Sequence, residues 1–204
     1  MVTNLKYFDY FEKIQHGTFN YPIAHYHVTK DHPRYHMMHH WHIEQEIIII
    51  LSGKLELTLD GKEYTAEEGD IFFINDGVVH SAVPHDAVYE SIVFDMRCLL
   101  SRNQVCNALV TNIIDHRDVI MPVMPHSEEI KSISERLVSA VSDEERGSEL
   151  LVQGLITEFL GFIIKHKLFT DEKIADKRST GQLVPFKRVV SYICLLYTSP
   201  SPRD

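Results

Sequence analysis

The sequence predicts a mainly β domain followed by helices, and three observations support this. Short apolar segments between residues 45 and 96 are separated by turn residues, which is typical of a sandwich or barrel. From residue 127 onward the apolar residues instead recur with the spacing of helices. The chain has 204 residues, 44% hydrophobic and 24% charged, so it can bury the core of one domain, or of one domain and a fragment of another.

The central strands are predicted from an aliphatic run and an alternating segment. The run IIIILSG, residues 47–53, predicts a buried strand that ends in a turn at Ser52-Gly53. In KLELTLDG, which follows it, the three leucines fall on one face, so we expect a half-buried strand. Asp60-Gly61 predicts a two-residue hairpin turn, because both turn positions need a positive φ.

Three further strands are predicted after this hairpin. KEYTA returns from the hairpin, and IFFIN follows and is closed by a turn at Asn75 to Gly77. After His80, the segment AVYESIVFDM predicts a last apolar strand that ends at about Met96.

Two helices are predicted in the second half of the chain. The first begins near Ser127, and Glu128 and Glu129 lie in its first turn, where they favour the helix dipole. The second runs from about Ser148 to Lys167, and its apolar set is too wide for a single stripe. It is therefore expected to bury two sides, either against its own domain and a partner chain or inside one chain.

The last part of the chain carries no core pattern of its own. Residues 169–185 are polar and predict a linker, and PFKRVVSYI after them predicts the opening of a new helix. Residues 194–204, CLLYTSPSPRD, resemble the translation of a sequencing adapter. We therefore leave this tail out of the fold prediction and expect the natural protein to continue past Ile193.

Charge and composition exclude some classes of function. The net charge of −9 comes without a basic cluster, so we expect no DNA binding by this chain alone. The longest aliphatic run, Ile47 to Leu51, is too short to cross a membrane, and the N-terminus has no apolar signal segment. The three cysteines fit no disulfide framework. These features predict a cytoplasmic protein without a membrane partner.

One group of polar residues carries chemistry. His40 and His42 share a face if they lie in a strand, and Glu46 or Glu44 can share it as well. His80 lies two hairpins later, on a strand that can return beside the first. Three imidazoles and a carboxylate suit a divalent metal ion or a polar ligand, and they could also simply hydrogen-bond one another. The residues alone leave these three interpretations open.

The spacing of this group resembles the cupin family of small jelly-roll β-barrels. Its first motif, His-x-His followed by Glu and then Gly, is matched by His40, His42, Glu46 and Gly53. Gly69, Gly77 and His80 match the second motif. The chain departs from the pattern at Arg34, Asn75 and Pro84, where the family has glycine, proline and asparagine.

A narrower resemblance, over about Phe19 to Ile193, is to the N-terminal sensor domain of AraC-type transcriptional regulators. It implies a cupin jelly-roll β-barrel followed by two antiparallel α-helices. Residues 1–125 would be the effector-binding barrel, with an N-terminal arm over about 18–33 that can help to close over the ligand. Residues 126–168 would form a homodimer, 169–185 the linker and 186–193 the start of a truncated helix-turn-helix domain.

The resemblance implies an effector-sensing and dimerisation domain of a transcriptional regulator, without catalytic activity. Such a domain is expected to bind a small polar effector such as a sugar and to need no cofactor. The regulator is expected to contact DNA only through the missing C-terminal domain. The expected ligand-binding residues are His40, His42, Glu46, His80, Arg34 and Tyr89. The first four could instead hold a divalent metal, and the alternative function is a metal-dependent cupin enzyme of isomerase or dioxygenase type.

Overall fold

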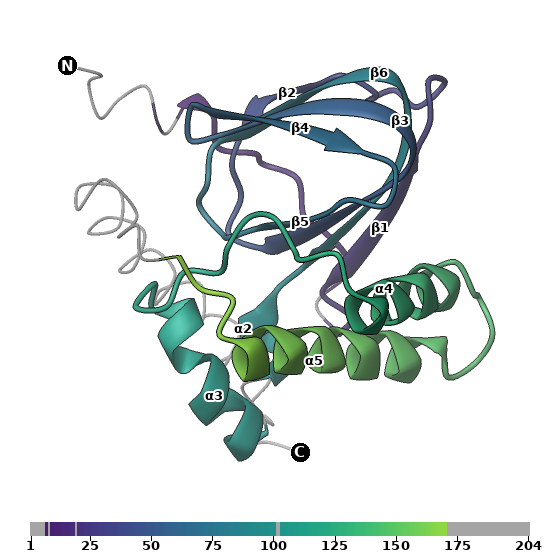
Figure 1. Cartoon of the computed structure of the whole chain (residues 1–204). Helices are drawn as coiled ribbons and strands as arrows, with labels where there is room; N and C mark the ends of the chain where they lie inside the picture. Colours follow the sequence, from purple (N-terminus) through teal and green to yellow (C-terminus); the bar gives the residue numbers. More distant parts are fainter. Residues whose placement is uncertain (1–6, 8, 19, 101–102, 171–204) are drawn as a thin grey trace, which may run out of the picture.

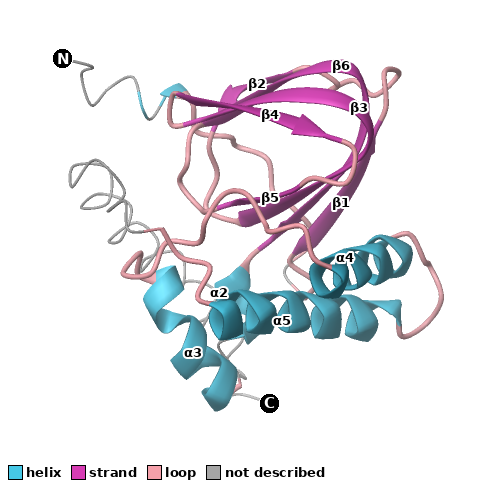
Figure 2. Ribbon diagram, viewed as in Figure 1, coloured by secondary structure: helices cyan, strands magenta, loops and turns pink. Residues whose placement is uncertain are grey.

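The computed structural model describes residues 7, 9–18, 20–100 and 103–170. Within them an antiparallel sheet bends into two facing layers, and helices pack beneath the lower one (Figure 1 and Figure 2). The strands are β1 (Ile23–Val28), β2 (Met37–His40), β3 (Gln45–Leu59), β4 (Lys62–Glu67), β5 (Ile71–Ile74) and β6 (His80–Phe94). The helices are α2 (Met96–Leu100), α3 (Gln104–Ile114), α4 (Glu128–Val141) and α5 (Ser148–His166).

The long strands β3 and β6 connect the two layers. They pair with each other over most of their length; β3 also pairs with β5 and then β4, and β6 with β2 and then β1. The prediction that the strand ends in a turn at Ser52-Gly53 is wrong, because β3 continues through a bulge there. Gly53 has φ +73°, and a Cβ at this position would collide with the backbone of Asp86. Glycine thus lets the strand bend without ending.

The isoleucine run is buried on both sides, which explains why it shows no alternation. Ile47 and Ile49 pack in the core between the sheet and the helices. Ile48 and Ile50 pack in a second core between the two layers. In the second half of β3, which pairs with β4, Leu55, Leu57 and Leu59 pack in this second core, as their alternation predicts.

Other local predictions fare differently. Asp60 and Gly61 have φ of 48° and 81° and join β3 to β4, which confirms the hairpin turn. The last strand begins at His80 itself, earlier than predicted. Part of the predicted arm, residues 18–33, is strand β1, because it pairs in register with β6. Helices α2 and α3 were not predicted.

Helices α4 and α5 lie against each other and against the lower layer (Figure 1). Ser127 caps α4, since its Oγ accepts a hydrogen bond from the Ile130 N–H at 3.4 Å. From α5, Phe159 stacks on Phe73 of the sheet, with ring centroids 6.4 Å apart. The prediction of a mainly β fold with helices is confirmed.

None of the helices in the described ranges has the length and hydrophobicity that a membrane span requires. The predictions for the new helix and the tail fall beyond residue 170, outside the described residues, and so does the linker predicted over 169–185 except for its first two residues. Of these, Phe169 pairs with Ile120 and packs against the core, so the prediction that the linker begins at residue 169 is wrong.

Candidate ligand and metal site

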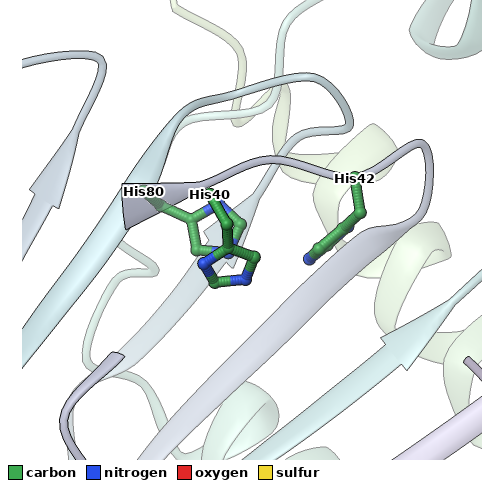
Figure 3. A group of neighbouring side chains, drawn as sticks. All are labelled: His40, His42 and His80. Carbon is green, nitrogen blue, oxygen red and sulfur yellow. The ribbon is translucent and has the colours of Figure 1, made fainter. Parts of the chain in front are cut away.

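Four polar residues are brought together from three parts of the sheet. His40 ends β2, His42 follows two residues later, and Glu46 is the second residue of β3. His80 opens β6, and the antiparallel register places it directly opposite His40. Figure 3 shows the three imidazoles gathered at this edge of the sheet. Glu46 and His80 are almost completely buried, at 2% and 0% exposure.

The three imidazoles are close enough to share one ligand. One ring nitrogen from each of His40, His42 and His80 lies within 4.8 Å of the others. Ring centroids are 4.1 Å apart for His40 and His80 and 5.0 Å apart for His42 and His80. One small ion or one polar group can therefore contact all three.

Backbone carbonyls set the tautomer of each ring. The Nδ1 atoms of His40, His42 and His80 lie 2.8, 3.1 and 2.9 Å from the carbonyl oxygens of Met38, Glu44 and Val78. A carbonyl oxygen only accepts hydrogen bonds, so each Nδ1 must carry the proton and donate it. The neutral rings therefore present three Nε2 lone pairs to one another, and a backbone bond of this kind typically orients metal-binding histidines.

Glu46 adds a negative charge beside these lone pairs. Its Oε2 lies 3.2 Å from Nε2 of His80 and 3.5 Å from Nε2 of His42, and its Oε1 accepts a hydrogen bond from Ser91 at 2.6 Å. The His80 contact is close but poorly aligned, which leaves buried Nε2 without a well-formed hydrogen bond. Lone pairs facing a carboxylate repel it, so a proton or a metal ion between them is required. The donor set fits a divalent ion.

The pKa values follow from this arrangement. Burial raises the pKa of Glu46, but His42 and His80 outweigh it and hold that pKa well below its usual range. Burial lowers the pKa of His80, and Glu46 outweighs it and raises the pKa. Burial and the neighbouring His80 lower the pKa of His40 to about 4, so His40 is neutral at pH 7.

A second polar group comes from the N-terminal segment, defined as residues 7 and 9–18. Glu12 Oε2 lies 3.0 Å from His16 Nε2, and the Arg34 guanidinium pairs with Glu12 Oε1. With His42, Glu12 and His16 form another set of three potential metal ligands. Burial raises the pKa of Glu12, but His16 and Arg34 outweigh it and lower the pKa to about 2.

Neither Glu12 nor His16 was predicted as a site residue. The N-terminal segment is held against Trp41, which lies between His40 and His42: Tyr7 stacks on the indole at 4.6 Å, and Trp41 Nε1 donates to Tyr7 O at 2.7 Å. This docking depends on contacts between distant segments, and no local spacing predicts it.

A cavity of about 230 Å³ adjoins both groups. Of the six predicted ligand-binding residues, the structure places five on its wall: His40, His42, Glu46, Arg34 and Tyr89. His80 lies behind them, in contact with Glu46. Burial raises the pKa of the Tyr89 phenol, which therefore stays protonated and donates to Tyr35 O at 3.5 Å.

Aromatic residues that could stack on a ligand are divided between wall and core. Tyr26 lines the cavity, while Phe73 lies in the core beside the helices. Trp41 is buried under the N-terminal segment.

A model of the AraC-like ligand binding domain matches residues 22–160. The chain therefore belongs to this family, and its sheet and cavity form a ligand-binding domain. No curated protein matches the chain.

Solved cupin structures are similar to parts of the chain. An RmlC-like cupin from Shewanella frigidimarina is 21% identical, with a TM-score of 0.31 over 35% of this chain and 64% of its own. A cupin of double-stranded β-helix fold from Methanocaldococcus jannaschii is 21% identical, with a TM-score of 0.30 over 36% and 67%. Oxalate decarboxylase of Bacillus subtilis, which has Mn(II) centres, is 25% identical, with a TM-score of 0.27 over 29% and 18%. The chain thus spans less than two thirds of the first of these structures.

Proposed function

We propose that this chain is the effector-sensing and dimerisation part of a one-component, DNA-binding transcriptional regulator without catalytic activity. The observation that supports it best is the cavity of about 230 Å³, with imidazole, carboxylate and guanidinium groups on its wall, inside an AraC-like ligand binding domain. Imidazoles, carboxylates and a guanidinium offer donors and acceptors to a small polar effector such as a sugar. In this proposal residues 1–125 form a jelly-roll barrel and residues 126–168 two antiparallel helices.

The effector must act through a difference in affinity between two arrangements of the protein. The cavity wall includes Glu12 and His16 of the N-terminal segment and also Glu46 of β3. The neighbour of Glu46, Ile47, faces the opposite side of the strand and packs in the core that contains α4 and α5. Occupation of the cavity can therefore bias both the segment and the helices.

Dimerisation through residues 126–168 is supported by the surface of α5. Leu150 and Leu151 are 75% and 60% exposed, although the opposite side of the same helix is buried against α4 and the sheet. Exposed leucines on an otherwise packed helix favour contact with a second copy of the chain.

The test is binding of promoter DNA by the protein that the complete gene encodes, measured by fluorescence anisotropy with and without candidate effectors. We expect effector-dependent binding, and we expect His42→Ala to lose the response to effector while it still binds DNA. A gene that encodes no pair of helix-turn-helix units after Ile193, or DNA binding that no effector changes, would contradict the proposal.

The alternative is a metal-dependent cupin enzyme, and the converging ring nitrogens of His40, His42 and His80 favour it. These residues, together with Glu46, would hold a divalent ion. When bound, such an ion acts as a Lewis acid toward a carbonyl or a water molecule. His80 and Glu46 would orient it from the buried end of the site, where water has little access.

Metal analysis of purified protein separates the two functions. An enzyme requires stoichiometric metal that is lost in His42→Ala and His80→Ala. His85→Ala is the matched control, because the His85 side chain is half-exposed and forms its ion pair with the exposed Glu56, outside the site. Metal-free protein that still binds a small ligand would reject the enzyme.

A further inference from the structure

One carboxylate inside the cavity belongs to a segment outside the sheet. The Glu12 side chain is only 5% exposed, and it reaches the cavity from the N-terminal segment. Next to it, this segment is joined to the rest of the protein by two backbone hydrogen bonds of 2.9 Å, from Glu12 N to Trp41 O and from Trp41 N to Tyr10 O. The carboxylate thus comes from a segment outside the six strands of the sheet.

The groups around Glu12 form a receptor for a carboxylate. The Arg34 guanidinium contacts Oε1, and His16 Nε2 lies 3.0 Å from Oε2. Tyr26 OH fixes the His16 ring through a 3.0 Å contact with Nδ1. A guanidinium and an imidazole from separate segments converge on one acid group, which is the arrangement that proteins use to recognise carboxylates.

We propose that Arg34 and His16 form a carboxylate subsite of the effector cavity. The effector is a small acid whose carboxylate replaces that of Glu12. This inference rests on the proposed ligand-binding function and specifies its ligand class. Two carboxylates cannot share the subsite, because like charges at contact distance repel strongly. A neutral sugar carries no anion for Arg34 and therefore leaves Glu12 in place.

The size of the cavity and its contacts limit the ligand further. A volume of about 230 Å³ lies below the range of roughly 300–1,000 Å³ of drug-sized pockets, so the acid is a short-chain acid or an acid derived from one monosaccharide. Tyr26, Tyr89 and Ser91 line the same cavity and offer hydroxyl groups to the rest of such a molecule.

Displacement of Glu12 has an optical reporter. Trp41 is the single tryptophan of the sequence, and it stacks on Tyr7 and contacts Phe11, with ring centroids 4.6 and 4.7 Å away. Since Glu12 bonds directly to the Trp41 backbone, withdrawal of Glu12 changes the surroundings of the indole. Trp41 fluorescence therefore follows occupation of the subsite.

The experiment compares matched acid and neutral probes. D-galacturonate with D-galactose, and acetate with acetamide, are titrated by calorimetry and by Trp41 fluorescence. The proteins are the wild type, Glu12→Gln, Arg34→Met and the control Glu56→Gln, whose side chain lies half-exposed outside the cavity wall. We expect the acids to bind at least about tenfold more tightly than their neutral partners. Glu12→Gln should bind the acids a further tenfold or so more tightly, because the internal competitor is gone.

We also expect Arg34→Met to lose acid binding and Glu56→Gln to behave as the wild type. Neutral probes that bind the wild type as tightly as the acids would overturn the inference and leave the proposed ligand binding intact. Unchanged or weaker acid binding by folded Glu12→Gln would overturn it too, and so would absence of acid binding by both proteins. Effector-dependent promoter binding tests the proposed function separately.

Discussion

A buried carboxylate outside the cavity provides the sharpest test of the electrostatics of this fold. Glu90 of β6 is 4% exposed, and its oxygens contact His25 Nε2 at 2.6 Å and His27 Nδ1 at 2.7 Å, which joins β1 to β6. Burial raises the pKa of Glu90, but the two histidines outweigh it and lower the pKa. A carboxylate with a lowered pKa stabilises the fold above its ordinary titration range, and this stability is lost as the pH falls through the lowered value.

The change Glu90→Gln keeps the shape and removes the charge. A hydrogen bond to a charged group contributes about 1.5–3 kcal/mol, and the His25 contact is sufficiently buried to count in full. His27 is 52% exposed, so its contact is reduced to the surface value of about 0–1 kcal/mol. We therefore expect a loss of roughly 2–3 kcal/mol in the free energy of unfolding at pH 7.

Urea unfolding at a series of pH values measures this loss, provided that the m-values of both proteins agree. The gap between the wild type and Glu90→Gln should be full at pH 7 and should close in acid, where the wild type also carries a protonated Glu90. Glu56→Gln is the control, because the exposed Glu56–His85 pair should give no measurable change. A loss no larger than that of the control, or a gap that persists in acid, would refute the reasoning.

Three further predictions concern stability and assembly. Gly53→Ala should lower the free energy of unfolding, measured in urea, by about 2 kcal/mol or more, and Gly61→Ala should lower it by less. Both glycines have a positive φ, but of the two only Gly53 has backbone atoms where a Cβ would lie, so equal losses would contradict this. Ser127→Ala should cost about 1 kcal/mol through loss of the cap of α4, and an unchanged midpoint would argue against that cap. Leu150→Lys should shift a dimer toward monomer in sedimentation velocity, whereas an unaltered dimer would place the interface elsewhere.

The predictable part of the fold is the part that depends on neighbours in sequence. The alternation before Asp60-Gly61 and the turn itself are local, and the structure confirms both. Strand β1 was missed because His25 and His27 interrupt its apolar pattern, and their partner Glu90 is more than sixty residues away. The bulge at Gly53 was mistaken for a turn that ends the strand, since a glycine is typical of both and only the pairing with β6 distinguishes them.

In the candidate site, too, the residues marked by a spacing motif were predicted, and Glu12, which is set by distant contacts, was not. The spacing of His40, His42 and Glu46 is a local signal, and His80 joins them because β2 and β6 pair in a fixed register. Glu12 has no comparable signal, because its place in the cavity follows from the docking of the N-terminal segment on Trp41.

The distribution of charge in the cavity connects the two proposals for its use. Glu12 is neutralised by Arg34 at the more exposed end, where the Arg34 side chain is 46% exposed. Within the part of the chain that the structure describes, the polar contacts of Glu46 at the buried end are with imidazoles and a hydroxyl, so a proton or a metal ion must balance its charge. A cation at the buried end and an anion at the exposed end are therefore compatible. A divalent ion beside Glu46 would increase the affinity of the subsite for an acid. Acid affinity measured with and without added divalent metal tests this coupling directly: if the metal strengthens acid binding, linkage requires the acid to strengthen metal binding by the same factor.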